Sequence, residues 1–446
     1  MFTHHSKFKI MATALALLAV PLMAGDKKKA KDSAPEAPKR LAFDITKIVW
    51  PNPPAIARIR FQEMYTGEKV DPALLEKPKK PKQSWMDRVA GAKSLAESNA
   101  KLPYQYMRVY GVAVDSKGFI YAADQGVDAI FVTNPQSKEV QFIRNDHEAH
   151  FGMVNGLAID DTDKLFVSDS KLHRILVFNP RHEMETAFGS DVLVDPCGIA
   201  IDRENRFLYV VDTQRDQVMV FDADTYKLLR TIGTTGKKHT LTEPGDFSLP
   251  THVAVDEEGD VYVTDTLNDR VEIFDADGVF ITEFGKIGDG PGHFERPKGI
   301  ALDSDGHIWV TDAGQQRVKV FDREGHLLIY FGGTGNYPGQ FAGIYGITID
   351  KQNRVYVTEQ FPGRLQVFQY VTDAQADAEK KKRSADGKQI PSNKATAPAK
   401  TSSSVAPLRR DQAWLRKNEA KTDIGPTPRS NHQYQKYLRP KEAIQS

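Results

Sequence analysis

Six carboxylates recur at the ends of similar apolar segments, and they are the first side chains in the sequence that could do chemistry. They are Asp124, Asp169, Asp212, Asp265, Asp312 and Glu359. A ring of carboxylates could bind a hard cation such as calcium. In four segments an arginine follows five residues later, across an expected turn, and this spacing favours a structural ion pair instead. The expected pairs are Asp169 with Arg174, Asp265 with Arg270, Asp312 with Arg317, and Glu359 with Arg364.

A second set of candidates stands at the beginning of the preceding apolar segment in each repeat. We expect these side chains to gather on one face and to contact a ligand there; they are Tyr110, Asn155, Cys197, His252, Lys298 and Tyr345. Five of the repeats have glycine at the position of His252, where a small residue lets backbones approach closely. The imidazole of His252 is therefore expected to project near the centre of the repeat array.

Histidine is a common zinc ligand, and His252 could share an ion with His147, His150 or His293. No spacing in the sequence encodes such a three-histidine site. We therefore expect no resident cofactor and assign no metal ligands, and calcium or zinc stay open as alternatives.

Cys197 is the only cysteine, which excludes an intramolecular disulfide and a four-cysteine zinc site. It could act as a nucleophile with His252 as its base. Its position directly after Pro196, at the start of a buried segment, favours inert packing instead. The sequence also lacks a Gly-x-Ser-x-Gly elbow, a Walker loop and a His-Glu-x-x-His motif. We therefore predict no catalytic residue.

The candidate residues are positioned by six repeats of one pattern. Each begins with a Gly, or with His252 in the fourth repeat, and an apolar segment that ends in Asp. A polar turn, a second apolar segment with an aromatic residue and a terminal carboxylate, and a third segment ending near Phe follow. The anchor positions are 111, 156, 198, 252, 299 and 346, which are 45, 42, 54, 47 and 47 residues apart. About four short antiparallel strands per 45 residues is typical of one propeller blade.

The fifth repeat reads GDGPGHFERPKGIALD at 288–303 and HIWVTDAGQQRVKVFDREG at 307–325. With the similar blade at 247–278, it resembles the NHL-repeat β-propellers. The resemblance implies an all-β, six-bladed β-propeller of NHL repeats, and it implies no particular reaction. Secreted peptidylamidoglycolate (amidating) lyases resemble this propeller and hold zinc with several histidines. A metal-dependent lyase or hydrolase is therefore the alternative function.

The sixth repeat ends after its third strand, at 364–370, and a polar tail begins. The missing fourth strand is predicted upstream, where RIRFQEMYTG occupies 58–67. We expect this strand to close the ring and to bury Ile59, Phe61 and Met64, because closure removes an open sheet edge.

The segments outside the repeats differ from them in charge. Residues 26–108 carry 18 Lys and Arg against 10 Asp and Glu, residues 371–446 carry 16 against 8, and residues 109–370 carry 24 against 41. We expect a signal peptide at 1–24, a basic Pro-rich flexible segment at 25–54, and the closing strand at 55–67. A linker with a short helix is expected at 68–108, the propeller at 109–371, and a disordered basic tail at 372–446.

These features together predict an exported protein, periplasmic or extracellular, whose monomeric propeller is a binding or scaffolding module. The expected partner is a protein of the cell envelope or the extracellular space, contacted through the face where the first strands begin. The acidic propeller argues against nucleic acid as a partner. The apolar stretch at 10–23 is too short to span a bilayer, so no membrane span is expected in the mature protein.

Overall fold

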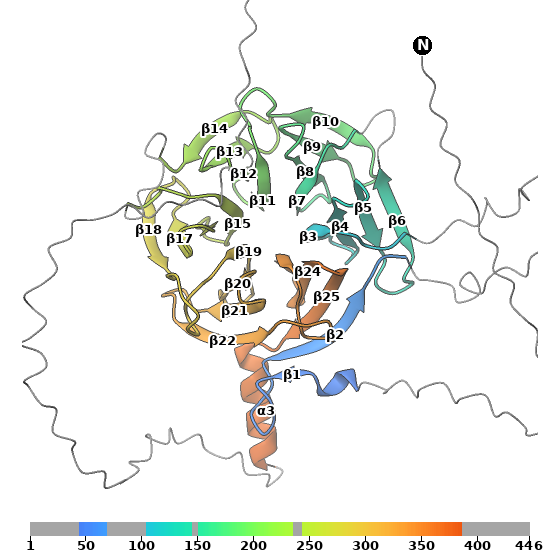
Figure 1. Ribbon diagram of the computed structural model, residues 1–446, viewed down its shortest axis with the longest axis vertical. Helices are drawn as coiled ribbons and strands as arrows, with labels where there is room; N and C mark the ends of the chain where they lie inside the picture. The colour runs from blue at the N-terminus through green and yellow to red at the C-terminus, as the bar shows by residue number, and fades with distance from the viewer. Residues whose placement is uncertain (1–43, 69–103, 145–149, 235–242, 386–446) are drawn as a thin grey trace, which may run out of the picture. The chain divides into compact units, whose positions relative to one another are not determined.

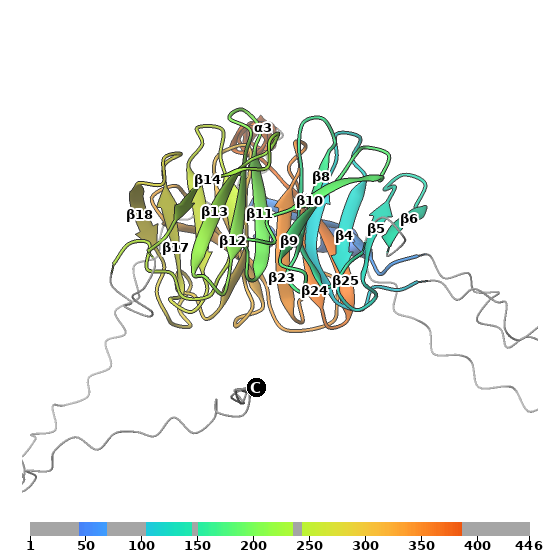
Figure 2. The same ribbon diagram turned by 90° about the horizontal axis from the view of Figure 1, so that it is seen from above.

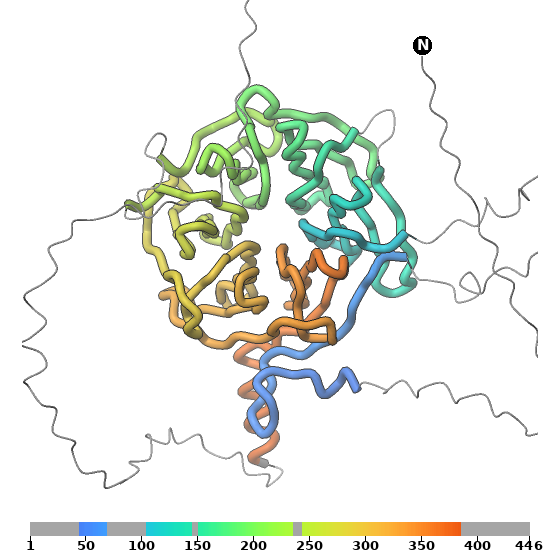
Figure 3. Tube along the Cα trace, in the orientation of Figure 1, coloured from blue at the N-terminus to red at the C-terminus, as the bar shows by residue number. Residues whose placement is uncertain are grey.

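The computed structural model describes residues 44–68, 104–144, 150–234 and 243–385. Their strands form six antiparallel sheets set as blades around one axis, so the predicted six-bladed, all-β propeller is confirmed (Figures 1 and 3). The first strand of each blade lies innermost, and the fourth lies on the rim. Residues 391–446 are a second unit outside the described residues.

Five blades are built from consecutive strands. Blade 1 comprises β3 (Val109–Val114), β4 (Ile120–Asp124), β5 (Ala129–Thr133) and β6 (Val140–Arg144). Blade 2 comprises β7 (Val154–Ile159), β8 (Leu165–Asp169), β9 (Arg174–Phe178) and β10 (Met184–Phe188). Blade 3 comprises β11 (Pro196–Asp202), β12 (Phe207–Asp212), β13 (Gln217–Asp222) and β14 (Leu228–Ile232).

The second half of the ring follows the same order. Blade 4 comprises β15 (Pro250–Val255), β16 (Val261–Asp265), β17 (Arg270–Phe274) and β18 (Phe280–Phe284). Blade 5 comprises β19 (Pro297–Leu302), β20 (Ile308–Asp312), β21 (Arg317–Phe321) and β22 (Leu327–Gly332). Blade 6 comprises β23 (Ile344–Ile349), β24 (Arg354–Gln360) and β25 (Gly363–Tyr370), and is completed by β2 (Ile59–Tyr65) and β1 (Val49–Trp50).

The second strands show why these residues form sheets. All five residues of β16, VYVTD, are buried, because each blade is covered on both faces by its neighbours. β-Branched and aromatic residues pack well in such a pleated layer. The turn before β16 is closed by Asp256, whose Oδ1 accepts hydrogen bonds from the backbone N–H groups of Glu258 and Asp260. Gly259 takes the left-handed φ of +88° that this turn requires.

The N-terminal strand closes the ring as predicted, because β2 pairs antiparallel with β25 in blade 6. A bulge between Phe61 and Glu63 shifts the alternation of side chains. Ile59 and Phe61 are buried, but Tyr65 takes the third buried place and Met64 is 38% exposed. The prediction that Met64 is buried was therefore wrong: Tyr65 packs with Leu365 and Val367 in the core that blades 6 and 1 share, and Met64 lies outside the buried clusters.

Blade 6 also has a fifth strand that the sequence reading missed. In β1, Trp50 pairs with Ile59, and its indole lies 5.1 Å from the ring of Phe331 and 6.0 Å from that of Phe368 (centroid to centroid). Residues 44–54 were expected to be flexible, but they contain this strand and the 3-10 turn Ile45–Lys47.

The segment after β25 is likewise ordered where disorder was predicted. Helix α3 spans Asp373–Ala385. Thr372 and Gln375 form a reciprocal capping box: the Gln375 backbone N–H donates to Thr372 Oγ1 at 3.3 Å, and the Thr372 N–H donates to Gln375 Oε1 at 3.2 Å. The helix is rich in Ala and Lys, which favour helix without an apolar period. The expected signal peptide lies outside the described residues, as does nearly all of the linker at 68–108 in which a short helix was expected. Within the described residues, no helix is long and apolar enough to cross a membrane.

Candidate functional site

The six repeated carboxylates are fully buried and bind backbone, at the end of the axis where the first strands begin. We call this end of the propeller the start face; it is seen edge-on in Figure 2. Asp312 shows the arrangement: its two oxygens accept hydrogen bonds from the N–H groups of Glu295 and Arg296, at 3.1 and 3.0 Å. Asp124, Asp169 and Asp212 hold the loops before their own blades in the same way. These carboxylates therefore fix the loops of the start face.

Two of the four expected ion pairs are formed. Arg270 Nε lies 3.2 Å from Asp265 Oδ2, and Arg364 Nε lies 2.6 Å from Glu359 Oε2. In both pairs the arginine is almost fully buried.

The other two arginines differ from the prediction. Arg174 donates to the carbonyl oxygen of His150, at 2.7 Å, and not to Asp169. Asp312 pairs with Lys319 at 2.8 Å, because that lysine reaches it from the middle of β21. Arg317 instead places its guanidinium 4.8 Å from the centroid of the Tyr330 ring.

Five of the six predicted ligand-face residues converge around Tyr345. Its ring centroid lies 4.4 Å from that of Tyr110 and 5.2 Å from that of His252. Lys298 Nζ lies 5.8 Å from the same ring, and the Tyr345 hydroxyl lies 3.6 Å from Cys197 Sγ. We call Tyr110, Cys197, His252, Lys298 and Tyr345 the axis cluster. The sixth residue, Asn155, contacts Gln125 and the carbonyl of Pro196 instead.

His252 is one residue further along its strand than its counterparts. The strand register places Thr251 at the position that Lys298 holds in the next blade. Thr251 is buried, and its hydroxyl donates to the carbonyl of Lys298 at 3.1 Å. His252 thus occupies the glycine position. At Gly198, one such glycine, an added Cβ would lie 2.6 Å from the carbonyl oxygen of Thr251, which explains why most blades exclude a side chain there.

The axis cluster contains no activated nucleophile. Burial, together with the charge of Lys298, lowers the pKa of His252 to about 3, so the imidazole is neutral. Burial raises the pKa of Cys197 and that of Tyr345, so the thiol and the phenol keep their protons. Burial, with the charge of Arg296, lowers the pKa of Lys298. The cluster therefore offers hydrogen-bonding groups and one amine.

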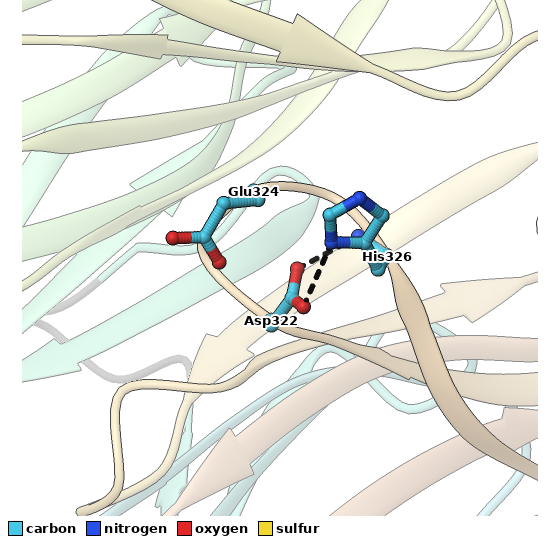
Figure 4. Close-up of side chains that lie close together, drawn as sticks. All are labelled: Asp322, Glu324 and His326. Atoms are coloured by element: carbon cyan, nitrogen blue, oxygen red, sulfur yellow. Dashed lines mark hydrogen bonds and ion pairs between the residues drawn. The ribbon is translucent and has the colours of Figure 1, made fainter.

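No predicted histidine lies in a metal-binding group within the described part of the protein. There, a single group of three side chains brings its ligand atoms within 4.8 Å of one another: Asp322, Glu324 and His326, in the turn between β21 and β22 (Figure 4). Asp322 already closes this turn, because it accepts from the His326 N–H at 2.7 Å and lies 3.0 Å from Nδ1. His150 and His293 form no such group with His252, and His147 lies outside the described residues.

The sequence reading missed a set of exposed apolar side chains around the cluster. They are Met107, Met153, Leu249, Leu267 and Phe361, each 40–61% exposed. Each lies in a loop just before a first strand or just after a second strand, at the start face. We call them the collar. No separate signal for them is visible in the sequence, because the same loops also contain aromatic residues that are buried, such as Phe151 and Phe247.

Comparisons with known proteins agree with the fold. A family model described as a six-bladed β-propeller matches residues 250–318. The human NHL repeat-containing protein 2 is 27% identical over 157 residues, which is 29% of this chain and 22% of that protein. The chain therefore spans about a fifth of the length of that relative. The predicted resemblance to NHL-repeat propellers is confirmed.

Solved structures of similar fold have low sequence identity to this protein. A virginiamycin B lyase from Staphylococcus aureus is 15% identical, with a TM-score of 0.45 over 60% of this chain and 82% of that one. A gluconolactonase from Xanthomonas campestris is 18% identical, with a TM-score of 0.45 over 59% of this chain and 86% of that one.

Proposed function

We propose that this protein is an exported binding module that recognises a protein ligand through its start face. The observation that carries the proposal is the axis cluster, in which five side chains from different blades meet at Tyr345. Residues brought together from distant parts of a repeat fold form a site that no single blade contains. The collar adds exposed apolar surface in loops of the same face.

The collar differs in its surface from the turns between first and second strands, which lie on the opposite face. The collar exposes five large apolar side chains at the start face. The six turns between first and second strands, on the opposite face, are all described and expose none. They read DSKG, DDTD, DREN, DEEG, DSDG and DKQN. Clustered apolar exposure beside polar groups is typical of a protein interaction site.

Leu249 gives the collar a feature of its own. It adopts φ +48°, in the left-handed region that an ordinary side chain rarely enters, and its side chain is 41% exposed. Its backbone N–H is held by Asp216 Oδ1 at 2.8 Å. A strained backbone that presents an apolar side chain to solvent supports a contact role.

Catalysis by a metal-dependent lyase or hydrolase is the alternative. It would need further ligands beside His252, and the described residues place no such group there. The neutral cysteine, imidazole and phenol also offer no activated nucleophile. Recognition is therefore the function that the geometry supports best.

Export, and with it a periplasmic or extracellular location, is part of the proposal. Its basis is the N-terminal sequence, in which Lys7 and Lys9 precede an apolar stretch and the small residues Ala24 and Gly25. Mass spectrometry of the protein from its source should find a polypeptide that begins near Gly25, and an intact Met1 would overturn export.

The binding proposal is tested by capture from the envelope fraction of the source organism with the purified protein as bait. Tyr345→Ala should lose partners that the wild type retains, whereas Glu258→Ala, on the opposite face, should retain them. Equal retention by both variants would contradict recognition through the start face. Stoichiometric zinc in the purified protein, with lyase or hydrolase activity that a chelator abolishes, would establish the alternative.

A further inference from the structure

Lys298 is the one cationic side chain of the axis cluster. Its side chain is partly buried, and in the described structure its Nζ forms no ion pair and no hydrogen bond; its recorded neighbour is the ring of Tyr345. Lys319, in the same blade, pairs with Asp312 at 2.8 Å and donates to the carbonyl of His293. Buried Arg270 and Arg364 are paired as well. Withdrawing an unpaired ammonium from water is costly, so its persistence points to a ligand that completes it.

A second unpaired polar group faces the same cluster. His252 Nδ1 is shielded from solvent and has no hydrogen-bond partner in the described structure. Its ring is neutral and lies against Tyr345, whose hydroxyl contacts only the weakly bonding sulfur of Cys197 among the described partners. A neutral imidazole nitrogen can donate a hydrogen bond, and a phenol hydroxyl can do the same.

We infer that the axis cluster is a receptor for one carboxylate group of a bound polypeptide, with Lys298 as its cation and with His252 and Tyr345 as hydrogen-bond donors. The inference rests on the proposed recognition through the start face and names the chemistry that is recognised there. The carboxylate belongs either to an Asp or Glu side chain or to the C-terminus of the bound polypeptide, since both present the same pair of oxygens.

The charged groups around the axis cluster favour a ligand that carries one negative charge. Lys298 supplies one cation, and Arg296 lies close enough to lower its pKa. Asp195 lies on the other side of the cluster, close enough that its charge raises the pKa of Cys197 and Tyr345. A dianionic phosphate would be repelled by Asp195, and Lys298 alone in the cluster would balance its two charges. A ligand with one negative charge leaves the site close to neutral.

The collar indicates that the carboxylate arrives on a polypeptide. Free small anions would gain nothing from Phe361, Leu267 or Met107, which are exposed on the same face. A carboxylate flanked by apolar residues would bury them together with the ion pair. Apolar contact around a desolvated charge pair is a common arrangement at the centre of protein interfaces.

The test measures binding of four N-acetylated pentapeptides to the full mature protein by calorimetry. The first has one aspartate between leucine and phenylalanine residues and an amidated end, and the second has asparagine in place of the aspartate. The third and fourth are all apolar and end in a free carboxylate and in an amide. We expect the aspartate peptide or the free-carboxylate peptide to bind at least tenfold more tightly than its neutral analogue. The pair that shows the difference identifies the recognised carboxylate as a side chain or as the C-terminus.

Variants assign the effect to Lys298. Lys298→Met should abolish the preference for the charged peptide, Lys298→Arg should keep part of it, and Lys351→Met, in a turn of the opposite face, should leave it unchanged. Thermal unfolding of each variant shows whether it folds, and Lys298→Arg keeps the test informative if the Met variant does not. Equal binding of charged and neutral peptides, retention of the preference in Lys298→Met, or no binding of any peptide would overturn the inference.

The envelope capture described above separates this inference from the proposed function. If Phe361→Asp loses the natural partner and Lys298→Met keeps it, the start face binds protein but the carboxylate receptor is wrong. If both variants keep the partner, both proposals fail.

Discussion

Blades 1–3 and blades 4–6 place different residues at one buried position in the middle of the third strand. In the first half this position is apolar, with Phe131, Leu176 and Met219. In the second half it is polar, with Glu272, Lys319 and Gln366. All six side chains are buried, so the difference is not one of exposure.

The polar residues of the second half bind the loops that lead into blades 4, 5 and 6. These loops share the motif Pro-Gly-x-Phe, at 244–247, 291–294 and 338–341. Gly245 N–H donates to Glu272 Oε2 at 2.7 Å, Lys319 donates to the carbonyl of His293, and Gln366 Nε2 donates to the carbonyl of Gln340 at 2.7 Å. The first half has no Pro-Gly-x-Phe motif, and its apolar third-strand residues cannot make such bonds, so its loops are held by Asp124, Asp169 and Asp212 alone among the two sets of buried side chains.

The comparison explains how the site is positioned. His252, Lys298 and Tyr345 each follow one of the loops that a buried polar side chain holds. Buried polar networks contribute little net stability, but they specify one arrangement when their groups are satisfied. The half of the ring that carries the amine and the central tyrosine is therefore the half whose start-face loops gain a further hydrogen bond from the third strand.

The largest expected effect on stability concerns blade 6, where β2 closes the ring. Phe61→Asp should destabilise the protein by more than about 4 kcal/mol, because it places a charge where a buried ring packs 5.6 Å from Phe368. Urea unfolding measures the change. Gln62→Asp, on the exposed side of the bulge, should change stability by less than about 0.5 kcal/mol. A fully stable Phe61→Asp variant would mean that the ring closes without β2.

The next effect contrasts two arginines at equivalent positions of the two halves. Arg364 donates to Glu359 and to the carbonyls of Asn336 and Gln340. Arg364→Ala should cost about 3–5 kcal/mol, because it leaves Glu359 and this loop without their donor. Arg174→Ala, in blade 2, should cost less than about 1.5 kcal/mol, since it removes one exposed bond to a carbonyl. Similar losses in the two variants would abolish the distinction between the halves.

Glu272 makes the second half sensitive to pH. Burial raises the pKa of its carboxyl from 4.5 to about 7, against the charge of Arg270. The folded protein then binds a proton that the unfolded polypeptide releases, so this group loses stability as pH rises from about 4.5 to 7. Glu272→Gln keeps the Gly245 bond without the charge. It should match the wild type near pH 4 and exceed it by up to about 3 kcal/mol near pH 8.

Thermal unfolding of Glu272→Gln across this pH range is the measurement. Glu283→Gln provides the control, because its side chain is 44% exposed and bonds to the same Arg270. A wild type that instead becomes more stable than Glu272→Gln as pH rises would show that Arg270 more than offsets the burial of Glu272.

The sequence predicted the parts of this architecture that repeat. Six anchors at regular spacing specify six blades, and the missing fourth strand of blade 6 is visible as an absence beside RIRFQEMYTG. Helix α3 is also encoded locally, by the capping box of Thr372 and Gln375. It was not predicted, because the segment lacks the apolar period of an amphipathic helix.

The features that the sequence did not predict depend on neighbouring strands. Tyr65 is buried in the core that blades 6 and 1 share, whereas Met64 is exposed, and a spacing rule within one strand pair cannot show this difference. Lys319 displaces Arg317 from Asp312 because it lies two residues further along the same strand face. The convergence on Tyr345 requires residues from five blades, whose mutual distances only the closed ring sets.

The smallest expected effect concerns α3, which follows the second half and has no counterpart in the first. The helix is joined to the closing strand by exposed ion pairs, Arg58 with Asp373 and Arg60 with Glu379, and it buries little beyond Ala376. Exposed ion pairs contribute about 0–1 kcal/mol each, and a buried Ala adds about as much. Ending the polypeptide after Thr372 should therefore lower the melting temperature by only a few degrees. Arg60→Ala, which removes one pair and keeps the helix, should lower it by less. A truncated protein that aggregates or melts far below the wild type would show that residues beyond Thr372 stabilise the pairing of β2 with β25. The stability of blade 6 would then depend on segments before and after the propeller.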